Sequence, residues 1–181
     1  MSAERAFIGT EQASVGTEQA SVGTERASVG TERASVEIRR AAAPDAERLT
    51  ALIHASAAYQ GEYARIIAGY RVEADYIARH AVHLAEDAAG RLLGFYSLVL
   101  DPPELDLAFV ADDLQGQGIG RLLIDHMLDG AREAGLTGVR VVSNPPAEGF
   151  YRSMGAQRVG TVAPAPPKIT WERPDLWFTV A

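Results

Sequence analysis

Three glycines at alternate positions, Gly116, Gly118 and Gly120, interrupt the stretch FVADDLQGQGIGRLL at residues 109–123. The stretch reads as an apolar strand, a glycine-rich turn and the start of an amphipathic helix. Without side chains in the turn, the backbone N–H groups of residues 115–121 can converge on one anion. The helix N-terminus adds a favourable dipole and unpaired donors. The segment therefore predicts a loop that binds a pyrophosphate.

Three phosphate-binding motifs compete for this loop. A P-loop needs Lys followed by Ser or Thr after its last glycine, and a dinucleotide fingerprint needs a third glycine at position 121, where Arg121 stands. The third pattern, Gln/Arg-x-x-Gly-x-Gly/Ala, is filled without a gap by Gln115, Gly118 and Gly120. At this point the chain resembles the GNAT superfamily of acetyl-CoA-dependent N-acyltransferases. The alternative interpretation is a glycine-rich turn that binds no ligand.

A second segment, NPPAEGFYRSMGAQRVG at residues 144–160, is similar to another pattern of the family: Asn, a few residues, Phe-Tyr, and then Gly-aromatic before a strand. It departs from that pattern at Ala156, where many members have Phe, and at the pair Pro145 and Pro146. The predicted element order, β-α-α-β-β-β-α-β-α-β-β over residues 36–181, is also that of the family. The resemblance implies an α+β fold with a mixed, mostly antiparallel sheet of six or seven strands. Helices should cover both faces, and the fourth and fifth strands should splay apart.

The resemblance also implies acetyl-CoA as co-substrate and no metal. The pantetheine arm should enter the splay and pair with the backbone of Phe109 and Val110, with Asn144 at the mouth. The cofactor-binding residues that we expect on this basis are Phe109, Val110, Gln115, Gly116, Gln117, Gly118, Ile119, Gly120, Arg121, Asn144 and Phe150.

Two side chains are candidates for proton transfer. An alkyl amine has a pKa near 10 and attacks a thioester only as the free base, so a proton acceptor assists the reaction. Glu104 opens the strand before the glycine loop, and several family members that use a carboxylate base place it there. Asp106 is the alternative because it shares a strand face with Glu104, and both acids could instead be solvated. Tyr151, at a place where the family often has a tyrosine near the cofactor sulfur, is the candidate acid for the departing thiolate, or else packs beside Phe150.

The acceptor amine is less constrained by the sequence. The region between the first two predicted helices and the loop at residues 163–175 should shape its pocket, and aromatic rings beside acids suit a cation as well as a hydrophobic core. The aromatic residues available are Tyr59, Tyr63, Tyr70, Tyr76 and Trp171. A small-molecule amine, an antibiotic, a polyamine, a peptide N-terminus and a protein lysine all stay open. The histidines, at positions 54, 80, 83 and 126, have no convincing metal-ligand spacing.

Composition limits the remaining possibilities. A chain of 181 residues can bury one core, and the absence of cysteine excludes disulfides, a thiolate nucleophile and cysteine-ligated metals. The net charge of −7 argues against nucleic acid and weakly favours a cationic partner. Without a long apolar run or a signal-peptide core at the N-terminus we expect a cytoplasmic protein that does not bind membranes. A homodimer stays open.

The first 35 residues differ from the rest of the chain. Four heptads stand in tandem, GTEQASV twice and then GTERASV twice, beginning at Gly9. Each heptad contains a glycine and lacks Leu or Ile, so a coiled coil is disfavoured. Such a segment buries too little apolar surface to offset its ordering entropy. We therefore expect residues 1–35 to form a flexible tail and residues 36–181 to form the acetyltransferase-like domain.

Periodicity and turn signals place the elements that must position these residues. Strands are expected at residues 36–41, 81–87, 91–100, 104–110, 138–144, 156–162 and 176–180, and helices at residues 44–58, 72–80, 119–134 and 147–154. Two functions from different classes fit this arrangement. One is an N-acetyltransferase that acts on a primary amine by direct attack in a ternary complex. The other is a non-catalytic acyl-CoA-binding sensor or interaction module that docks through its tail.

Overall fold

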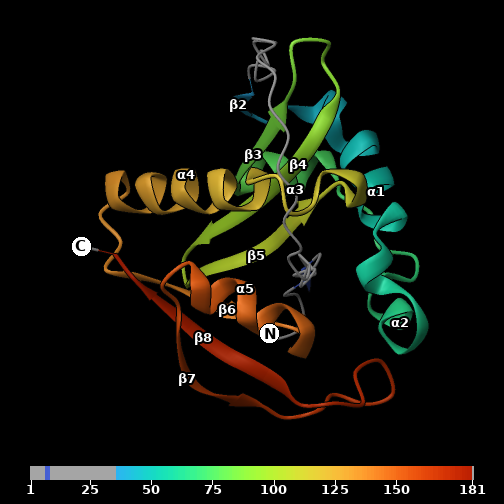
Figure 1. The fold of residues 1–181 in the computed structure, drawn as a ribbon, viewed down its shortest axis with the longest axis vertical. Coiled ribbons are helices and arrows are strands. Elements are labelled where there is room, and N and C mark those ends of the chain that lie inside the picture. Colours follow the sequence, from blue (N-terminus) through green and yellow to red (C-terminus); the bar gives the residue numbers. More distant parts are fainter. Residues whose placement is uncertain (1–6, 9–35, 181) are drawn as a thin grey trace, which may run out of the picture.

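The computed structural model describes residues 7–8 and 36–180, so the heptad repeats lie outside the described residues. Seven strands follow one another across a single sheet, which helices cover on both faces (Figure 1). In sheet order these strands are β2 (Glu37–Arg40), β3 (Ala81–Glu86), β4 (Leu92–Leu100), β5 (Pro103–Val110), β6 (Gly138–Val142), β8 (Arg173–Thr179) and β7 (Gln157–Val162). A two-residue strand, β1 (Phe7–Ile8), pairs in parallel with β5 at Leu107 and Ala108.

The helices follow the predicted order, except that a short additional helix follows the first one and the first helix ends early. They are α1 (Ala46–Ala55), α2 (Ala64–Ile67), α3 (Ala74–Arg79), α4 (Ile119–Glu133) and α5 (Glu148–Ser153). The first helix ends at Ala55, three residues before the expected position 58, because Ser56 is extended with a ψ of 122°. The chain then makes short 3-10 turns that bury the ring of Tyr59 against Phe109, with ring centroids 5.5 Å apart. Where the helix was expected to continue, the chain turns and buries the Tyr59 ring instead. No helix in the described part of the chain is long and apolar enough to cross a membrane.

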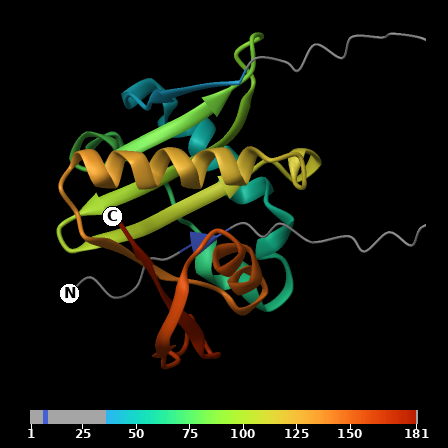
Figure 2. The ribbon, with the colours of Figure 1, turned by 60° about the vertical axis from the view of Figure 1, so that its left-hand side comes forward.

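The splay that the resemblance implied is present between β5 and β6, the fourth and fifth strands after residue 36. These two strands are parallel and pair at one position, Glu104 with Arg140. By contrast, β4 pairs with β5 from Leu100 to Gly94 in antiparallel register. Beyond Glu104 the two halves of the sheet diverge, so that β7 and β8 lie at a steep angle to β4 and β5 (Figure 2). The predicted fold class is therefore confirmed.

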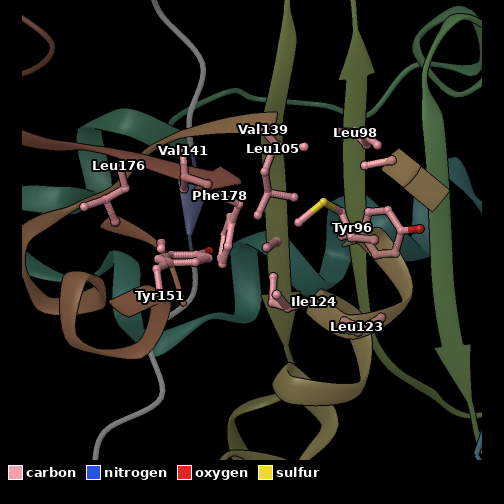
Figure 3. Packing of buried hydrophobic residues seen from close by; sticks show 14 of the residues in the cluster. Tyr96, Leu98, Leu105, Leu123, Ile124, Val139, Val141, Tyr151, Leu176 and Phe178 are labelled. Atoms are coloured by element: carbon pink, nitrogen blue, oxygen red, sulfur yellow. The ribbon is translucent and has the colours of Figure 1, made fainter. Parts of the chain in front are cut away.

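Two hydrophobic clusters hold helices on the two faces of the sheet. On one face, α4 presents a buried stripe at helical spacing that includes Leu123, Ile124 and Met127. Figure 3 shows this cluster, which extends from Leu123 and Tyr96 to Tyr151 and Phe178 near α5. On the opposite face, α1 and α3 pack over Leu107 and Phe109 of β5. Both clusters therefore meet at β5, the strand that borders the splay.

An ion cluster fixes the start of α1 to the edge of the sheet. The Asp45 carboxylate accepts two hydrogen bonds from the Arg39 guanidinium, at 2.8 and 2.9 Å, and one from the Ala42 backbone N–H at 2.8 Å. Arg39 and Arg48 also donate to Glu86 on β3. The Arg39 hydrogen bonds are the main cause that lowers the pKa of Asp45 from 3.8 to about 2.

Candidate active site

The glycine loop has the backbone that an anion-binding turn requires. Gly116 and Gly118 have positive φ angles of 74° and 88°, and Gly118 directly precedes α4. A Cβ on either glycine would meet nothing within 4 Å, so the left-handed backbone and not crowding is what calls for glycine. The first hydrogen bond of α4 runs from the Leu122 N–H to the Gly118 carbonyl at 3.0 Å. The N–H groups of residues 119–121 therefore remain as donors at the helix N-terminus.

A pocket opens beside this loop, between β5, α4 and α5. Its walls include seven of the residues that the sequence singled out: Phe109, Val110, Gln115, Gly116, Gly120, Phe150 and Tyr151. Three further wall residues, Ala108, Leu123 and Ile124, were not among the predicted site residues. Six predicted site residues are not part of its wall: Glu104, Gln117, Gly118, Ile119, Arg121 and Asn144. The apolar spacing of α4 in the sequence could have identified Leu123 as a pocket residue, because the side chains of that stripe point toward β5.

Gly94 is a site residue that the sequence analysis missed. It lies on β4 opposite Val110. A Cβ at Gly94 would approach the Phe109 carbonyl oxygen to 2.6 Å and the Leu123 side chain to 3.0 Å. Only glycine therefore lets β4, α4 and the end of β5 come this close. A lone glycine within a strand pattern is a weak signal for such an approach.

Tyr151 places its hydroxyl group in a dry environment. The side chain is fully buried, and its oxygen has no hydrogen-bond partner among the described residues. The ring packs edge-on against Phe150 and Phe178, with centroids 5.1 and 6.3 Å away. Burial raises the pKa of the Tyr151 hydroxyl, so the group keeps its proton at neutral pH. Tyr151 lines the pocket, and a protonated hydroxyl can donate a hydrogen bond to a ligand that reaches it.

Glu104 lies where β5 and β6 separate, on the face opposite Leu105. Its carboxylate is 14% exposed, and Oε2 lies 3.8 Å from Nη1 of Arg140. Arg140 in turn donates two hydrogen bonds to Asp175, from Nε at 2.8 Å and from Nη2 at 2.9 Å. Burial is the main cause that raises the pKa of Glu104 above its usual value of 4.5; Arg140 lowers it and Asp175 raises it. A carboxylate with a raised pKa is a better proton acceptor.

Asp106, the alternative base, is engaged in an internal hydrogen bond. Its carboxylate accepts a hydrogen bond from the hydroxyl of Tyr76, and that hydroxyl also lies 2.7 Å from Ser97 Oγ. All three residues are buried, and they join α3, β4 and β5. The arrangement ties the helix to the sheet, which is a structural use for both Asp106 and Tyr76.

Several of the predicted acceptor-site aromatics meet at the far end of the splay. The Asn144 amide donates to the Tyr59 hydroxyl at 3.4 Å and accepts from the Trp171 indole N–H at 3.4 Å. Tyr63 packs edge-on against Trp171, with centroids 4.7 Å apart. Asn144 thus joins the region after α1 to the loop before β8. Tyr70 belongs to the hydrophobic cluster on this face.

Comparison with known proteins agrees with this geometry. The acetyltransferase (GNAT) domain family matches residues 62–162. The chain belongs to the GNAT family. A peptidyl-lysine N-acetyltransferase, YjaB of Salmonella typhimurium, is 30% identical over 105 residues, which cover 58% of this chain and 66% of that protein. A mycothiol acetyltransferase of Pseudarthrobacter chlorophenolicus is 31% identical over 110 residues, which cover 55% of this chain but only 34% of that protein.

Solved structures confirm the GNAT fold. A GCN5-related N-acetyltransferase from Rhodopseudomonas palustris superimposes with a TM-score of 0.69 at 20% identity, covering 83% of this chain and 99% of that one. In the GNAT domain described here, the histidines do not contribute to the pocket. His83 and His126 instead pack with Tyr96 on the α4 side, where the Tyr96 hydroxyl lies 2.8 Å from His126 Nδ1. Within residues 7–8 and 36–180, no group of three His, Asp or Glu side chains is arranged to hold a metal ion.

Proposed function

We propose that this GNAT domain is an N-acetyltransferase that transfers the acetyl group of acetyl-CoA to a primary amine by direct attack. The observation that carries the proposal is that two candidate proton-transfer groups border the same strand, β5. Glu104, with a raised pKa, lies where β5 and β6 part. Tyr151 lines the pocket beside the same strand, and its buried hydroxyl has no hydrogen-bond partner among the described residues. A binding module that performs no chemistry has no need for either feature.

The residues of the pocket fit acetyl-CoA. The donors at the start of α4 suit the pyrophosphate, and the apolar wall formed by Val110, Leu123 and Phe150 suits the pantetheine arm. The bound co-substrate would supply the electrophilic thioester carbonyl. The divergence of β5 from β6 leaves the backbone edge at Phe109 and Val110 free of β6 pairing, next to Leu107 and Ala108, which pair with β1. The amides of the arm can bond at Phe109 and Val110. Fixing both reactants in this way accelerates the reaction by proximity.

Glu104 is the group that we assign to the amine proton. It accepts that proton directly or through water as the amine attacks, while Asp106 is engaged with Tyr76. We assign Tyr151 to the departing thiolate. Because burial disfavours a tyrosinate, the Tyr151 hydroxyl stabilises the thiolate by donating a hydrogen bond and stays protonated.

For the acceptor, we propose a lysine side chain in a peptide as the first candidate. The name of the YjaB relative records this substrate class. The half-buried rings of Tyr63 and Trp171, which pack edge-on, offer an aromatic surface to an alkylammonium group. Small amines, including polyamines, are the second class to test.

An acetyl-CoA turnover screen tests the proposal. The purified protein is incubated with acetyl-CoA and a panel of lysine peptides and small amines, and free thiol is the readout. The variant Glu104→Gln should lower turnover by ~10²–10⁴-fold, the usual contribution of one general base. Its affinity for acetyl-CoA should stay unchanged, because Glu104 lies outside the pocket wall.

Binding is measured separately from turnover. Acetyl-CoA at about 100 times its Kd should stabilise the protein by roughly 2.7 kcal/mol, which raises Tm by about 5–10 °C for a domain of this size. The variant Gly118→Asp should abolish this shift, because it places a carboxylate in a left-handed turn where phosphate should bind. Stabilisation without turnover on any amine would favour the non-catalytic acyl-CoA-binding module, and no stabilisation would refute both functions.

A further inference from the structure

A balanced group of four charges lies on one face of the sheet at the base of the splay. Glu104 comes from β5, Arg140 from β6, and Arg173 and Asp175 from β8. The register explains the grouping. Arg140 pairs with Glu104 on one side, while on the other Asp175 lies diagonally across from it, opposite Val142. Side chains two residues apart along a strand share a face and reach one another across it.

The hydrogen bonds within this group are unequal. Asp175 occupies the Nε and Nη2 edge of the Arg140 guanidinium with two parallel bonds at 2.8 and 2.9 Å. The remaining nitrogen, Nη1, lies 3.8 Å from Glu104, which is beyond hydrogen-bond distance. Two parallel bonds to one carboxylate are a strong arrangement for arginine, because its donors are held in one plane that matches the two carboxylate oxygens. The shared cation is therefore committed to Asp175.

We propose that Asp175 is a positioning residue for catalysis: by holding the Arg140 guanidinium, it prevents this cation from closing on Glu104 and so keeps that carboxylate basic. The inference rests on the proposed role of Glu104 as the base. The two carboxylates compete for one guanidinium, and the geometry shows which one has it. A Glu104 in direct contact with Arg140 would be a weaker proton acceptor at the same distance from the substrate.

The other groups around Glu104 do not replace this effect. On the β4 side its strand partner is Val99, which carries no charge. Arg173 on β8 is buried and lowers the pKa of Glu104 less than Arg140 does. Asp106, two residues along β5, is bonded to Tyr76. Arg140 is thus the strongest cationic influence on Glu104, and Asp175 is the residue that controls its position.

Two opposed variants test the inference. Asp175→Asn removes a negative charge and frees Arg140, so the pKa of Glu104 should fall. The acid limb of the pH profile of kcat/KM should then move to lower pH, and the plateau should fall because the base is weaker. Arg140→Gln should move the limb the opposite way, to higher pH. The double variant should return close to the parent, because both charges of the pair are gone.

Controls separate this tuning from a structural role. Asp129→Asn breaks an exposed ion pair with Arg132 on α4 and should leave the profile unchanged. Asp175→Glu keeps a carboxylate for Arg140 and should restore the position of the limb. Because the amine substrate is the same for all variants, its own titration contributes equally to every profile. Loss of rate at all pH values, with neither the limb nor the pKa of Glu104 moved, would mean that Asp175 acts only through folding and would overturn the inference.

A direct measurement distinguishes failure of this inference from failure of the proposed function. The pKa of the Glu104 carboxyl group is followed by ¹³C NMR, with Glu104→Gln identifying its resonance. A lower pKa in Asp175→Asn together with a shifted limb supports both ideas. A lower pKa with an unmoved limb supports the control by Asp175 but refutes Glu104 as the base. An unchanged or higher pKa overturns the inference.

Discussion

Replacing Tyr151 with Phe should stabilise the ligand-free protein while it slows catalysis. The Tyr151 oxygen is buried without a hydrogen-bond partner among the described residues, and burying a hydroxyl in this way costs about 1–3 kcal/mol. Removing it keeps the ring contacts with Phe150 and Phe178. We expect a gain of about 1 kcal/mol, which corresponds to a Tm increase of roughly 2–4 °C.

Tyr76 provides a matched control, because it is a buried tyrosine whose hydroxyl is bonded. Tyr76→Phe removes the hydrogen bond donated to the Asp106 carboxylate and the contact of the same hydroxyl with Ser97 Oγ. A bond to a charged group contributes about 1.5–3 kcal/mol, so this variant should lose about 2 kcal/mol and roughly 4–8 °C in Tm. The same chemical change should therefore act with opposite signs at two buried sites.

Thermal and urea unfolding without acetyl-CoA measure the stability of both variants, and thiol release measures turnover. Turnover of Tyr151→Phe should fall by about tenfold to a hundredfold, at the low end for one proton-transfer group, because the hydroxyl donates a hydrogen bond only. If Tyr151→Phe loses as much stability as Tyr76→Phe, the Tyr151 hydroxyl has a partner in the native protein and the reasoning fails. Unchanged turnover would remove Tyr151 from the mechanism.

Three further predictions concern the supporting structure. Gly94→Ala should cost about 1–3 kcal/mol of folding stability and weaken acetyl-CoA binding, because its Cβ would meet the Phe109 carbonyl oxygen at 2.6 Å. Gly130→Ala on α4, where a Cβ would make ordinary contacts, should not destabilise the protein. If calorimetry shows the same loss of stability for both variants, the close approach at Gly94 is not the cause. Asp45→Asn should lose about 2 kcal/mol of folding stability at pH 7, because the pKa of Asp45 falls from 3.8 to about 2 on folding. This stability is present above about pH 4 and disappears as the pH falls toward 2. In urea titrations over that pH range, the parent should therefore lose stability more steeply than the variant. Deleting residues 1–35 should change Tm by less than about 2 °C, since only the two-residue strand β1 pairs with the domain in the described part of the chain; a larger loss would show that the tail is part of the fold.

Local patterns in the sequence predicted most of the elements and the anion-binding loop. The glycine turn at Gly116 and Gly118 and the apolar stripe of α4 depend on neighbours within a few residues. The resemblance added the splay and the candidates Glu104 and Tyr151. The resemblance predicted the strand or helix on which each of these two residues lies, but it did not predict which groups surround them.

The surroundings of the site depend on contacts between distant segments. Tyr59 and Asn144 are 85 residues apart in the chain, and Arg140 and Asp175 are 35 apart. The second pair exists because β8, the last strand in the chain, lies between β6 and β7 in the sheet. The strand patterns do not encode this order, since an alternating strand can pair with any neighbour of matching face. The sequence by itself therefore determined the local chemistry of the loop and the order of the elements. Only the tertiary structure decided that Asp175 binds Arg140 beside Glu104, that Gly94 admits the end of β5, and that the Tyr151 hydroxyl is buried without a partner among the described residues, because these features arise from packing across the sheet.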